Sequence, residues 1–275
     1  MEKAVALLRL SRIEHGVMVG FAVTAGAISA GVTDPGRIAV GVVSALLAEV
    51  FLFATNDILN LEEDRINSPE RPLVKGELSV EEAWAFSLSA LALSLILSAL
   101  LNWWAVVIII FAASLGFAYN CCLKRSGILG NAVVALLTAI SFLYGGIGVA
   151  GVVKEKIVLF TAIAFTANVG REIAKGIRDI VGDRAAGIST VAVLFGVRAA
   201  GVLASIFMAS AVAMSFIGFR YVTNKLAYGL LIGFTDALFT YSAFLAAFCP
   251  SMEVASRVRK LTLVGMAVAI LAFMT

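Results

Sequence analysis

The sequence predicts an all-α membrane protein in which nine transmembrane helices surround a central cavity, and three observations favour this fold class. Apolar residues make up 61% of the chain and charged residues 14%, whereas soluble domains average about 45–50% and about 25%. The mean hydropathy is +1.01. The apolar residues form runs of the ~20 residues that a helix needs to cross a bilayer. Such a chain buries its surface in lipid, which excludes a secreted enzyme, a nucleic-acid-binding protein and a disordered scaffold.

The apolar runs define the predicted spans, which together form one domain over residues 1–275. The spans are 15–33, 38–56, 83–101, 103–120, 129–151, 157–175, 199–219, 226–248 and 260–275. The four prolines, Pro35, Pro69, Pro72 and Pro250, all lie between them, as expected because proline ends helices. Ser79 and Glu82 precede the third span with the spacing of a capping box.

The basic residues are distributed unevenly between the two ends of these spans. Of the 21 lysines and arginines, five belong to one side, namely Arg37, Lys154, Lys156, Arg220 and Lys225. The other sixteen lie at the N-terminus or in the loops after the second, fourth, sixth and eighth spans. Because cytoplasmic loops are rich in Lys and Arg, we expect a multi-pass protein of the cell membrane with a cytoplasmic N-terminus.

Two of the cytoplasmic segments are long, 56–82 and 171–198, and they follow the second and sixth spans. Each begins at a helix end that carries carboxylates. The recurrence of this element four spans later predicts two structural repeats, each of which supplies half of a site. One histidine and three cysteines without metal-ligand spacing leave the chemistry to carboxylates, amides, basic side chains and tyrosines.

The first candidate cluster follows the second span. Asp57, Asn60 and Asp64 step by three and four residues, so they share one helix face. Asn56 lies one residue off that face, and Glu49 lies two turns deeper in the span. Oxygen ligands along one stripe suit Mg²⁺, which also keeps substrate phosphates as partners. The alternative is a solvated helix end with ordinary charges.

The second candidate cluster follows the sixth span. Asp179 and Asp183 are four residues apart and would face the same way if the helix continues, with Lys175 and Arg178 close enough to pair with them or with a phosphate. The alternative is a salt-bridged interfacial helix. Two acidic clusters that face each other across a cavity could hold two or three Mg²⁺ ions on a diphosphate.

Other polar residues carry weaker signals. Tyr119, Lys124 and Arg125 follow the fourth span, where an aromatic belt and positive-inside anchors are usual, although Lys124 could neutralise phosphate oxygens beside two acidic clusters. Asp236 lies in the middle of the eighth span, so it is either functional or bonded to a neighbouring helix through Thr235 or Thr240. Glu14 and His15 could touch the substrate or form an interfacial pair.

With these segments in view, the chain resembles the UbiA superfamily of intramembrane prenyltransferases. That family has nine helices, an Asn-Asp-x-x-Asp-x-x-x-Asp motif after helix 2 and a second Asp-rich motif after helix 6. Asn56, Asp57 and Asp64 match the first motif, whereas Asn60 stands where a third Asp is usual. The second motif looks most like the archaeal branch that makes digeranylgeranylglyceryl phosphate, although Arg178 replaces a common acid there.

The resemblance implies a Mg²⁺-dependent transfer of a prenyl group from an isoprenyl diphosphate, through an ionised allylic carbocation, to the hydroxyl of geranylgeranylglyceryl phosphate. The implied metal ligands are Asp57, Asp64, Asp179 and Asp183, assisted by Asn56 and Asn60. The implied phosphate and substrate contacts are Arg71, Lys75, Lys124, Arg125, Lys175 and Arg178. Tyr119 would lie near the reacting carbon, Glu49 would polarise the site, and residues 65–78 would cap it on the cytoplasmic side.

Two rival functions remain open at this point. An enzyme of the same fold could prenylate an aromatic ring, as in quinone, haem or chlorophyll synthesis, because an aromatic carboxylate and a glycerol phosphate both need cations nearby. A secondary transporter also uses inverted repeats and buried acids, but transporters seldom place two acidic motifs of this kind at one membrane face.

Overall fold

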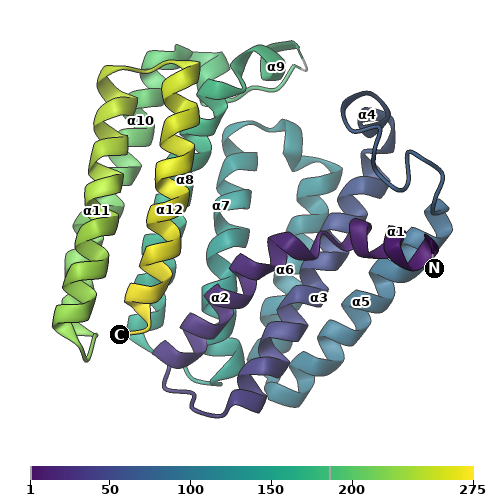
Figure 1. Ribbon diagram of the computed structural model, residues 1–275, viewed down its shortest axis with the longest axis horizontal. Coiled ribbons are helices and arrows are strands. Elements are labelled where there is room, and N and C mark those ends of the chain that lie inside the picture. The colour runs from purple at the N-terminus through teal and green to yellow at the C-terminus, as the bar shows by residue number, and fades with distance from the viewer. Residues whose placement is uncertain (1, 186) are drawn as a thin grey trace.

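The computed structural model describes residues 2–185 and 187–275, with the side chains of 2, 13–15, 66 and 67 outside the description. The described residues form helices and no strands (Figure 1). The α-helices are α1 (Glu2–Ser11), α2 (Ile13–Ser29), α3 (Pro35–Leu59), α4 (Leu61–Asn67), α5 (Val80–Leu101), α6 (Trp103–Cys121), α7 (Ile128–Leu143), α8 (Glu155–Arg178), α9 (Ile180–Ala185), α10 (Val191–Ser215), α11 (Lys225–Phe248) and α12 (Met252–Phe273). Three short helical turns complete the chain: η1 (Leu123–Arg125), η2 (Tyr144–Val149) and η3 (Phe216–Arg220).

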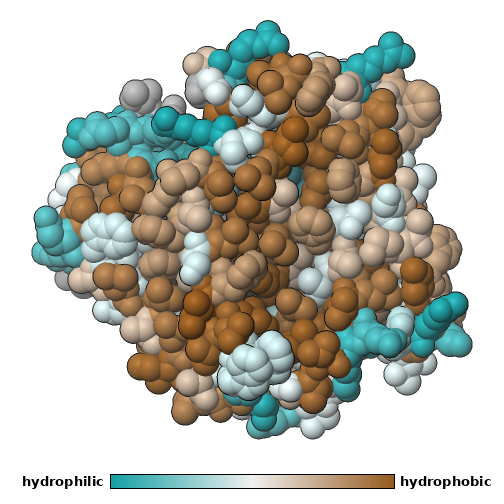
Figure 2. Space-filling model, turned by 180° about the vertical axis from the view of Figure 1, so that it is seen from behind, coloured by the Kyte–Doolittle hydropathy of each residue, from teal (hydrophilic) through white to brown (hydrophobic). Residues whose placement is uncertain are grey.

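Each of the nine predicted spans coincides with a helix, and seven helices of the described chain have the length and composition to cross a membrane. The seven are α3, α5, α6, α7 with η2, α8, α10 with η3, and α11. The remaining two ranges coincide with α2, a shorter apolar helix, and with α12, which carries three basic residues near its start. Figure 2 shows a broad apolar belt with hydrophilic residues at its upper and lower margins. The protein is therefore a multi-pass membrane protein, and the count of nine spans stays a prediction.

The long helices are arranged so that α4 and α9 lie at the same end of the molecule, at the top of Figure 1. α4 directly follows α3, and α9 directly follows α8, as the predicted repeat of the layout requires. α3 packs mainly against α5, whereas α8 packs against α7, α10 and α12. The two acidic segments thus come from different groups of helices and lie at the same end of the molecule.

Two predicted boundaries were wrong, and the helices themselves explain why. The segment 171–198 is mostly helical, because α8 continues to Arg178 and α10 begins at Val191. α10 is interrupted only at Gly196, whose φ of 82° is readily adopted by glycine alone. The first span is shorter than predicted, since α2 ends at Ser29, and a separate helix α1 precedes it.

Close backbone contacts hold α2 against α7 and η2. A Cβ atom on Gly26 would lie 2.2 Å from the carbonyl oxygen of Phe142, and one on Gly145 would lie 2.0 Å from the carbonyl oxygen of Val23. Only glycine permits these helices to approach so closely, which is a common way to pack helices in a membrane. Gly16 packs closely against α3 in the same way, because its Cβ would meet Leu46 at 2.5 Å.

The segment 65–78 and helix α1 pack on each other beside the end of α3. Leu73 and Leu78 form a small apolar cluster with Leu10 of α1 and with alanines of α1, α3 and α5. Ion pairs of Arg9 with Glu77 and of Lys3 with Glu82 join α1 to this segment and to the start of α5. The predicted capping box of Ser79 and Glu82 is confirmed.

Candidate active site

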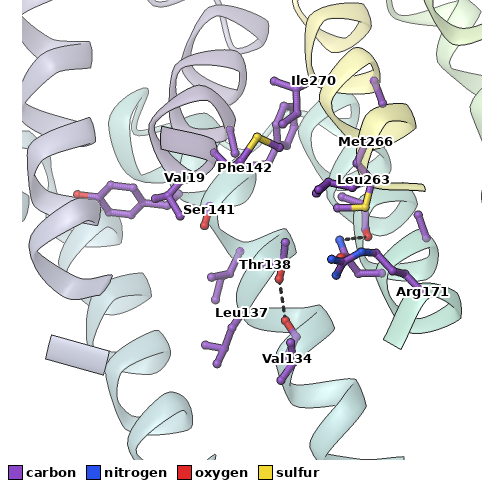
Figure 3. Close-up of a pocket in the computed structure, with 18 of the residues that line it drawn as sticks. Val19, Val134, Leu137, Thr138, Ser141, Phe142, Arg171, Leu263, Met266 and Ile270 are labelled. Carbon is purple, nitrogen blue, oxygen red and sulfur yellow. Dashed lines mark hydrogen bonds between the residues drawn. The ribbon is translucent and has the colours of Figure 1, made fainter. Parts of the chain in front are cut away.

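A cavity of about 920 Å³ runs between α2, α3, α6, α7, α8, α11 and α12. Its polar lining gathers where α3, α6 and α8 end and where α2 and α12 begin: Arg12, Asn56, Tyr119, Asn120, Asn168, Arg171, Lys175 and Arg259. The rest of the wall is mainly apolar, as Val19, Leu137, Phe142 and Ile270 illustrate in Figure 3. A cavity of this shape can hold a molecule with a charged head and a long apolar tail.

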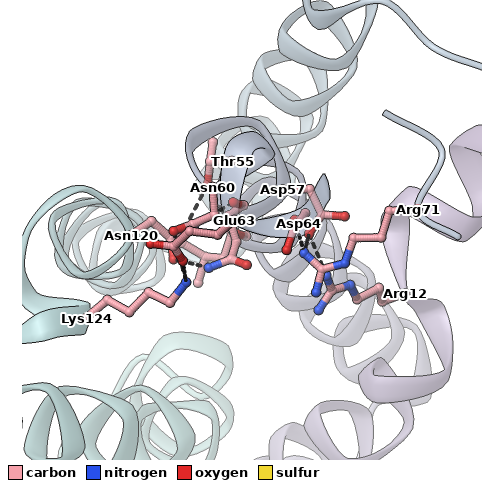
Figure 4. A network of polar contacts seen from close by, with 11 residues as sticks. Arg12, Thr55, Asp57, Asn60, Glu63, Asp64, Arg71, Asn120 and Lys124 are labelled. Carbon is pink, nitrogen blue, oxygen red and sulfur yellow. Dashed lines mark hydrogen bonds and ion pairs between the residues drawn. The ribbon is translucent and has the colours of Figure 1, made fainter. Parts of the chain in front are cut away.

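The first predicted acidic cluster is held by two arginines (Figure 4). Asp57 at the end of α3 is 2% exposed and accepts hydrogen bonds from Arg12 at 2.5 Å and from Arg71 at 3.0 Å. The same nitrogen of Arg71 also contacts a carboxylate oxygen of Asp64. The spacing of three and four residues therefore does bring Asp57 and Asp64 together, as predicted.

Arg12 reaches this cluster because of the backbone between α1 and α2. Its φ of 47° and ψ of 44° are left-handed, and no other described residue except glycine has a positive φ. Non-glycine residues rarely adopt this conformation, which is often found at functional sites. The guanidinium lies 5.0 Å from the ring centroid of Phe53 and lines the cavity.

A second network joins the end of α3 to the turn after α6. Lys124 donates to Asn60 at 2.9 Å and to Glu63 at 2.8 Å, and Arg125 donates to Glu63 at 2.5 Å. These two cations hold the pKa of the Glu63 carboxyl below its usual range. Lys124 thus lies beside the first acidic motif, as predicted, but its charge is partly balanced by a carboxylate that the sequence analysis did not single out.

An amide pair links Asn56 to the cavity wall formed by α6. The Asn56 side chain donates to Asn120 at 2.9 Å, and Asn120 donates to the carbonyl of Leu52 and to the hydroxyl of Thr55. Asn56 and Tyr119 both line the cavity. Asn56 therefore occupies a position off the Asp57 face, as predicted, and is fixed by a neighbouring helix.

The second predicted cluster is looser than the first. Arg178 holds Asp179 with bonds of 2.5 and 2.7 Å, and Asp183 lies one turn later, where its backbone N–H donates to the Asp179 carbonyl at 2.9 Å. The helix does not continue smoothly, because Asp179 ends α8 before α9 begins. Burial raises the pKa of the Asp183 carboxyl, and the Asp179 carboxylate adds to the rise.

The donor set of each acidic pair suits Mg²⁺, although no three His, Cys, Asp or Glu side chains of the described chain converge as a complete metal cage. Mg²⁺ commonly uses one or two carboxylates and completes its shell with water and substrate phosphates. One nitrogen of Arg71 contacts both Asp57 and Asp64. The two carboxylates are therefore close enough to share a single cation.

The predicted site residues divide into two groups in the structure. Glu49, Asn56, Tyr119 and Lys175 line the cavity. The other predicted residues do not line it: Asp57, Asn60, Asp64, Arg71, Lys75, Lys124, Arg125, Arg178, Asp179 and Asp183. Lys75 is exposed, and no described residue of the 65–78 segment lines the cavity.

Sequence reasoning missed several polar residues of the cavity wall. Arg12 and Arg259 were counted only as markers of the cytoplasmic side, and Asn168 carried no motif. Arg171 lies in the predicted segment 171–198 and Asn120 at the end of the predicted fourth span, but neither was given a role. A signal was available for Arg171, because a cation two turns inside a span is costly unless it has a partner.

Asp236 lines the deep part of the cavity and accepts a hydrogen bond from Ser215 of α10 at 2.8 Å. Its partner is thus neither of the two threonines expected, since Thr235 instead donates to the carbonyl of Gly265. The side chains of Glu14 and His15 lie outside the described residues.

Comparison with known proteins gives relatives over the whole chain. Digeranylgeranylglyceryl phosphate synthase of Archaeoglobus fulgidus is 32% identical over 277 residues, which cover 98% of this chain and 94% of that protein. The synthase of Thermococcus kodakarensis is 34% identical over 224 residues, with coverage of 80% and 78%.

Solved structures give the same result. A structure described as digeranylgeranylglyceryl phosphate synthase in membranes superposes with a TM-score of 0.89 at 30% identity and covers 100% of this chain and 98% of that one. A UbiA homolog from Archaeoglobus fulgidus bound to GPP and Mg²⁺ shares the fold, with a TM-score of 0.70, 20% identity and coverage of 98% and 100%.

A family model also matches most of the chain. The model described as the UbiA prenyltransferase family matches residues 17–273, which include every helix from α3 to α12. This match sets the transporter reading aside. The chain belongs to the UbiA prenyltransferase family and is a prenyltransferase.

Proposed function

We propose that the protein transfers a geranylgeranyl group from its diphosphate to the hydroxyl of geranylgeranylglyceryl phosphate, with Mg²⁺ as the cofactor. The relatives support this reaction, since they are digeranylgeranylglyceryl phosphate synthases that are similar to this chain over nearly its whole length. The solved relative with GPP and Mg²⁺ supports the donor class and the metal. The product would be a membrane ether lipid with two prenyl chains.

The observation that carries the proposal is the division of the cavity into a polar mouth and an apolar interior. Arg12, Asn56 and Lys175 are at the mouth, and Phe142 and Phe239 are in the interior. A diphosphate needs cations and hydrogen-bond donors, whereas its prenyl tail needs an apolar wall. One cavity thus supplies both requirements of a prenyl diphosphate at a membrane boundary.

The carboxylates of Asp57 and Asp64 on one half, and of Asp179 and Asp183 on the other, would hold Mg²⁺ against the donor diphosphate. When bound, the metal would neutralise charge on the diphosphate as it leaves. Arg71, which bridges the first carboxylate pair, would then be displaced from it. Its guanidinium would turn towards the phosphate oxygens, which are also acceptors for a planar fork of N–H groups.

The chain's own residues would lower the barrier in two further ways. Arg12 lines the cavity, so it would stabilise the negative charge that grows on the leaving diphosphate. Tyr119, on the wall of α6, would face the reacting carbon with its ring. The apolar wall beyond it would keep water from the allylic cation, so that the acceptor hydroxyl captures it.

The reaction would take place at the cytoplasmic face of the cell membrane. The end that carries α4 and α9 (Figure 1) is the end where sequence analysis places most basic residues. Soluble donors and the acceptor headgroup would arrive from that side, while both prenyl chains remain in the bilayer.

The test is turnover of geranylgeranyl diphosphate by the purified protein in the presence of geranylgeranylglyceryl phosphate. We expect Mg²⁺-dependent diphosphate release in the wild type and loss of turnover in Asp57→Ala. Glu70→Gln is the matched control, because Glu70 is an exposed acid of the neighbouring segment without a described partner. Normal turnover by Asp57→Ala at saturating Mg²⁺ would overturn the assignment.

A further inference from the structure

Three basic side chains line the cavity on the side opposite the first acidic cluster. Arg171 and Lys175 extend from α8, and Arg259 extends from α12. Arg171 and Lys175 each donate to Glu172 at 3.0 Å, and Glu172 is 4% exposed. Arg171 and Lys175 therefore share one carboxylate and Arg259 adds a third cation, so that the three cations and Glu172 together carry a net charge of +2 on the cavity wall.

The bonding capacity of these side chains is only partly used. Nε of Arg171 is buried and has no hydrogen-bond partner among the described residues, and Figure 3 shows Arg171 extending into the cavity. The Arg259 guanidinium makes no hydrogen bond or ion pair with any described residue, yet it lies near enough to act on Arg171 as a like charge. Two neighbouring arginines without a second carboxylate favour an anion between them, because an uncompensated buried charge is costly.

We infer that Arg171, Lys175 and Arg259 form the seat for the phosphate of the acceptor, a phosphate monoester on a prenylated glycerol. This inference rests on the proposed function. A phosphate monoester carries about −1.5 to −2 charges near neutral pH, which matches the excess charge of the cluster. Guanidinium groups bind such oxygens through two parallel hydrogen bonds.

The position of the seat distinguishes the acceptor phosphate from the donor diphosphate. Arg171 precedes Asp179 by eight residues, which is about 12 Å along a helix at 1.5 Å per residue, so the seat lies inside the mouth. The carboxylates proposed for the metal and diphosphate lie at the mouth itself. Because glycerol has three carbons, the acceptor phosphate stands within three carbons of its free hydroxyl, and its seat must lie beside the reacting carbon.

The structure also explains why other basic residues do not form this seat. Lys124 and Arg125 are both engaged by Glu63, and Lys75 is exposed. None of these three lines the cavity. Of the six cations that the sequence analysis grouped for phosphate and substrate contacts, Lys175 alone lines the cavity, and the other described cations that line it are Arg12, Arg171 and Arg259.

The test compares Arg259→Gln with Arg257→Gln, an exposed arginine two residues earlier on the same helix. We expect Arg259→Gln to raise KM for geranylgeranylglyceryl phosphate about 10- to 100-fold, the range for a lost charge-assisted hydrogen bond. KM for geranylgeranyl diphosphate should stay within about twofold, and Arg259→Lys should restore part of the loss. Arg257→Gln should match the wild type.

The dephosphorylated acceptor, geranylgeranylglycerol, provides the second arm. The wild type and Arg259→Gln should use this acceptor equally poorly, because it has no phosphate for Arg259 to bind. An equal rise in KM for donor and acceptor, or no change in either, would overturn the inference.

A binding measurement separates failure of this inference from failure of the proposed function. Without donor or Mg²⁺, geranylgeranylglyceryl phosphate should raise the melting temperature of the wild type and of Arg257→Gln but not of Arg259→Gln. If neither the wild type nor Arg257→Gln makes product from this acceptor, the proposed function fails. If wild type and Arg259→Gln are stabilised equally, the seat is wrong while the proposed function can stand.

Discussion

Arg71 is the residue whose removal most directly tests how the first acidic cluster is held. One of its nitrogens contacts both Asp57 and Asp64, and these carboxylates are 2% and 7% exposed. In Arg71→Met, Arg12 alone would remain to balance two buried carboxylates. Breaking a buried ion pair typically costs 3–5 kcal/mol, but the Arg71 side chain is 22% exposed, so we expect a loss of about 2–3 kcal/mol without metal.

The assay is thermal unfolding in detergent, with and without Mg²⁺. For a chain of this size about 1 kcal/mol corresponds to about 2–4 °C, so Arg71→Met should melt about 4–12 °C below the wild type without metal. Mg²⁺ should restore more of the melting temperature in Arg71→Met than it adds to the wild type, because Arg71 competes with the metal for the same two carboxylates.

The matched control is Lys75→Met, because Lys75 is an exposed cation of the same segment. Its melting temperature should equal that of the wild type. Equal losses in Arg71→Met and Lys75→Met, or an Mg²⁺ effect that is the same in wild type and Arg71→Met, would refute the reasoning. The first outcome would make the loss a general effect of segment 65–78, and the second would separate Arg71 from the metal site.

The remaining predictions concern three other features. Asp183→Ala should abolish turnover while Glu70→Gln retains it, as measured by diphosphate release; comparable rates would remove Asp183 from the metal site. The pKa of the Glu63 carboxyl is lowered in the folded protein, so its ion pairs stabilise the fold above the ordinary pKa of 4.5 and are lost as pH falls through the lowered pKa. Melting curves should show this loss of stability at acid pH in the wild type and not in Glu63→Gln. Gly26→Ala should cost about 1–3 kcal/mol by overpacking, because its Cβ would lie 2.2 Å from a carbonyl oxygen of α7. Gly20→Ala, with 3.5 Å to its nearest neighbour, should melt near the wild type.

The sequence predicted the fold class and the first acidic cluster because both depend on local spacing. Runs of ~20 apolar residues require helices in lipid, and a separation of two helical turns puts Asp57 and Asp64 on one side, where both contact Arg71, whereas Asn60 bonds to Lys124 instead. α3 ends at Leu59 and α4 begins at Leu61. The two carboxylates stay on one side across this break, since the backbone N–H of Asp64 still donates to the carbonyl of Asn60.

The sequence could not predict which cations reach the cavity, because that depends on how distant helices pack. Arg12 enters the site because it adopts a left-handed backbone conformation between α1 and α2, and the sequence around Arg12 does not predict that conformation. Arg259 meets Arg171 only because α12 packs against α8. By contrast, Lys75 lies close to the first acidic motif in the sequence, yet it is exposed.

The sixth span was predicted to end at residue 175, whereas α8 continues to Arg178. Its last turns are polar, but Arg171 and Lys175 line a cavity rather than lipid. Hydropathy alone cannot separate a polar loop from a polar helix face that points into a protein cavity.

The central claim is the identity of the acceptor, and one competition experiment tests it most directly. Purified protein is incubated with geranylgeranyl diphosphate, Mg²⁺ and equal amounts of geranylgeranylglyceryl phosphate and 4-hydroxybenzoate, and the lipid extract is examined by mass spectrometry. We expect the diether glycerol phosphate as the product, with no prenylated benzoate. Prenylated benzoate as the sole product would keep the prenyltransferase and its metal site and would contradict the proposed acceptor.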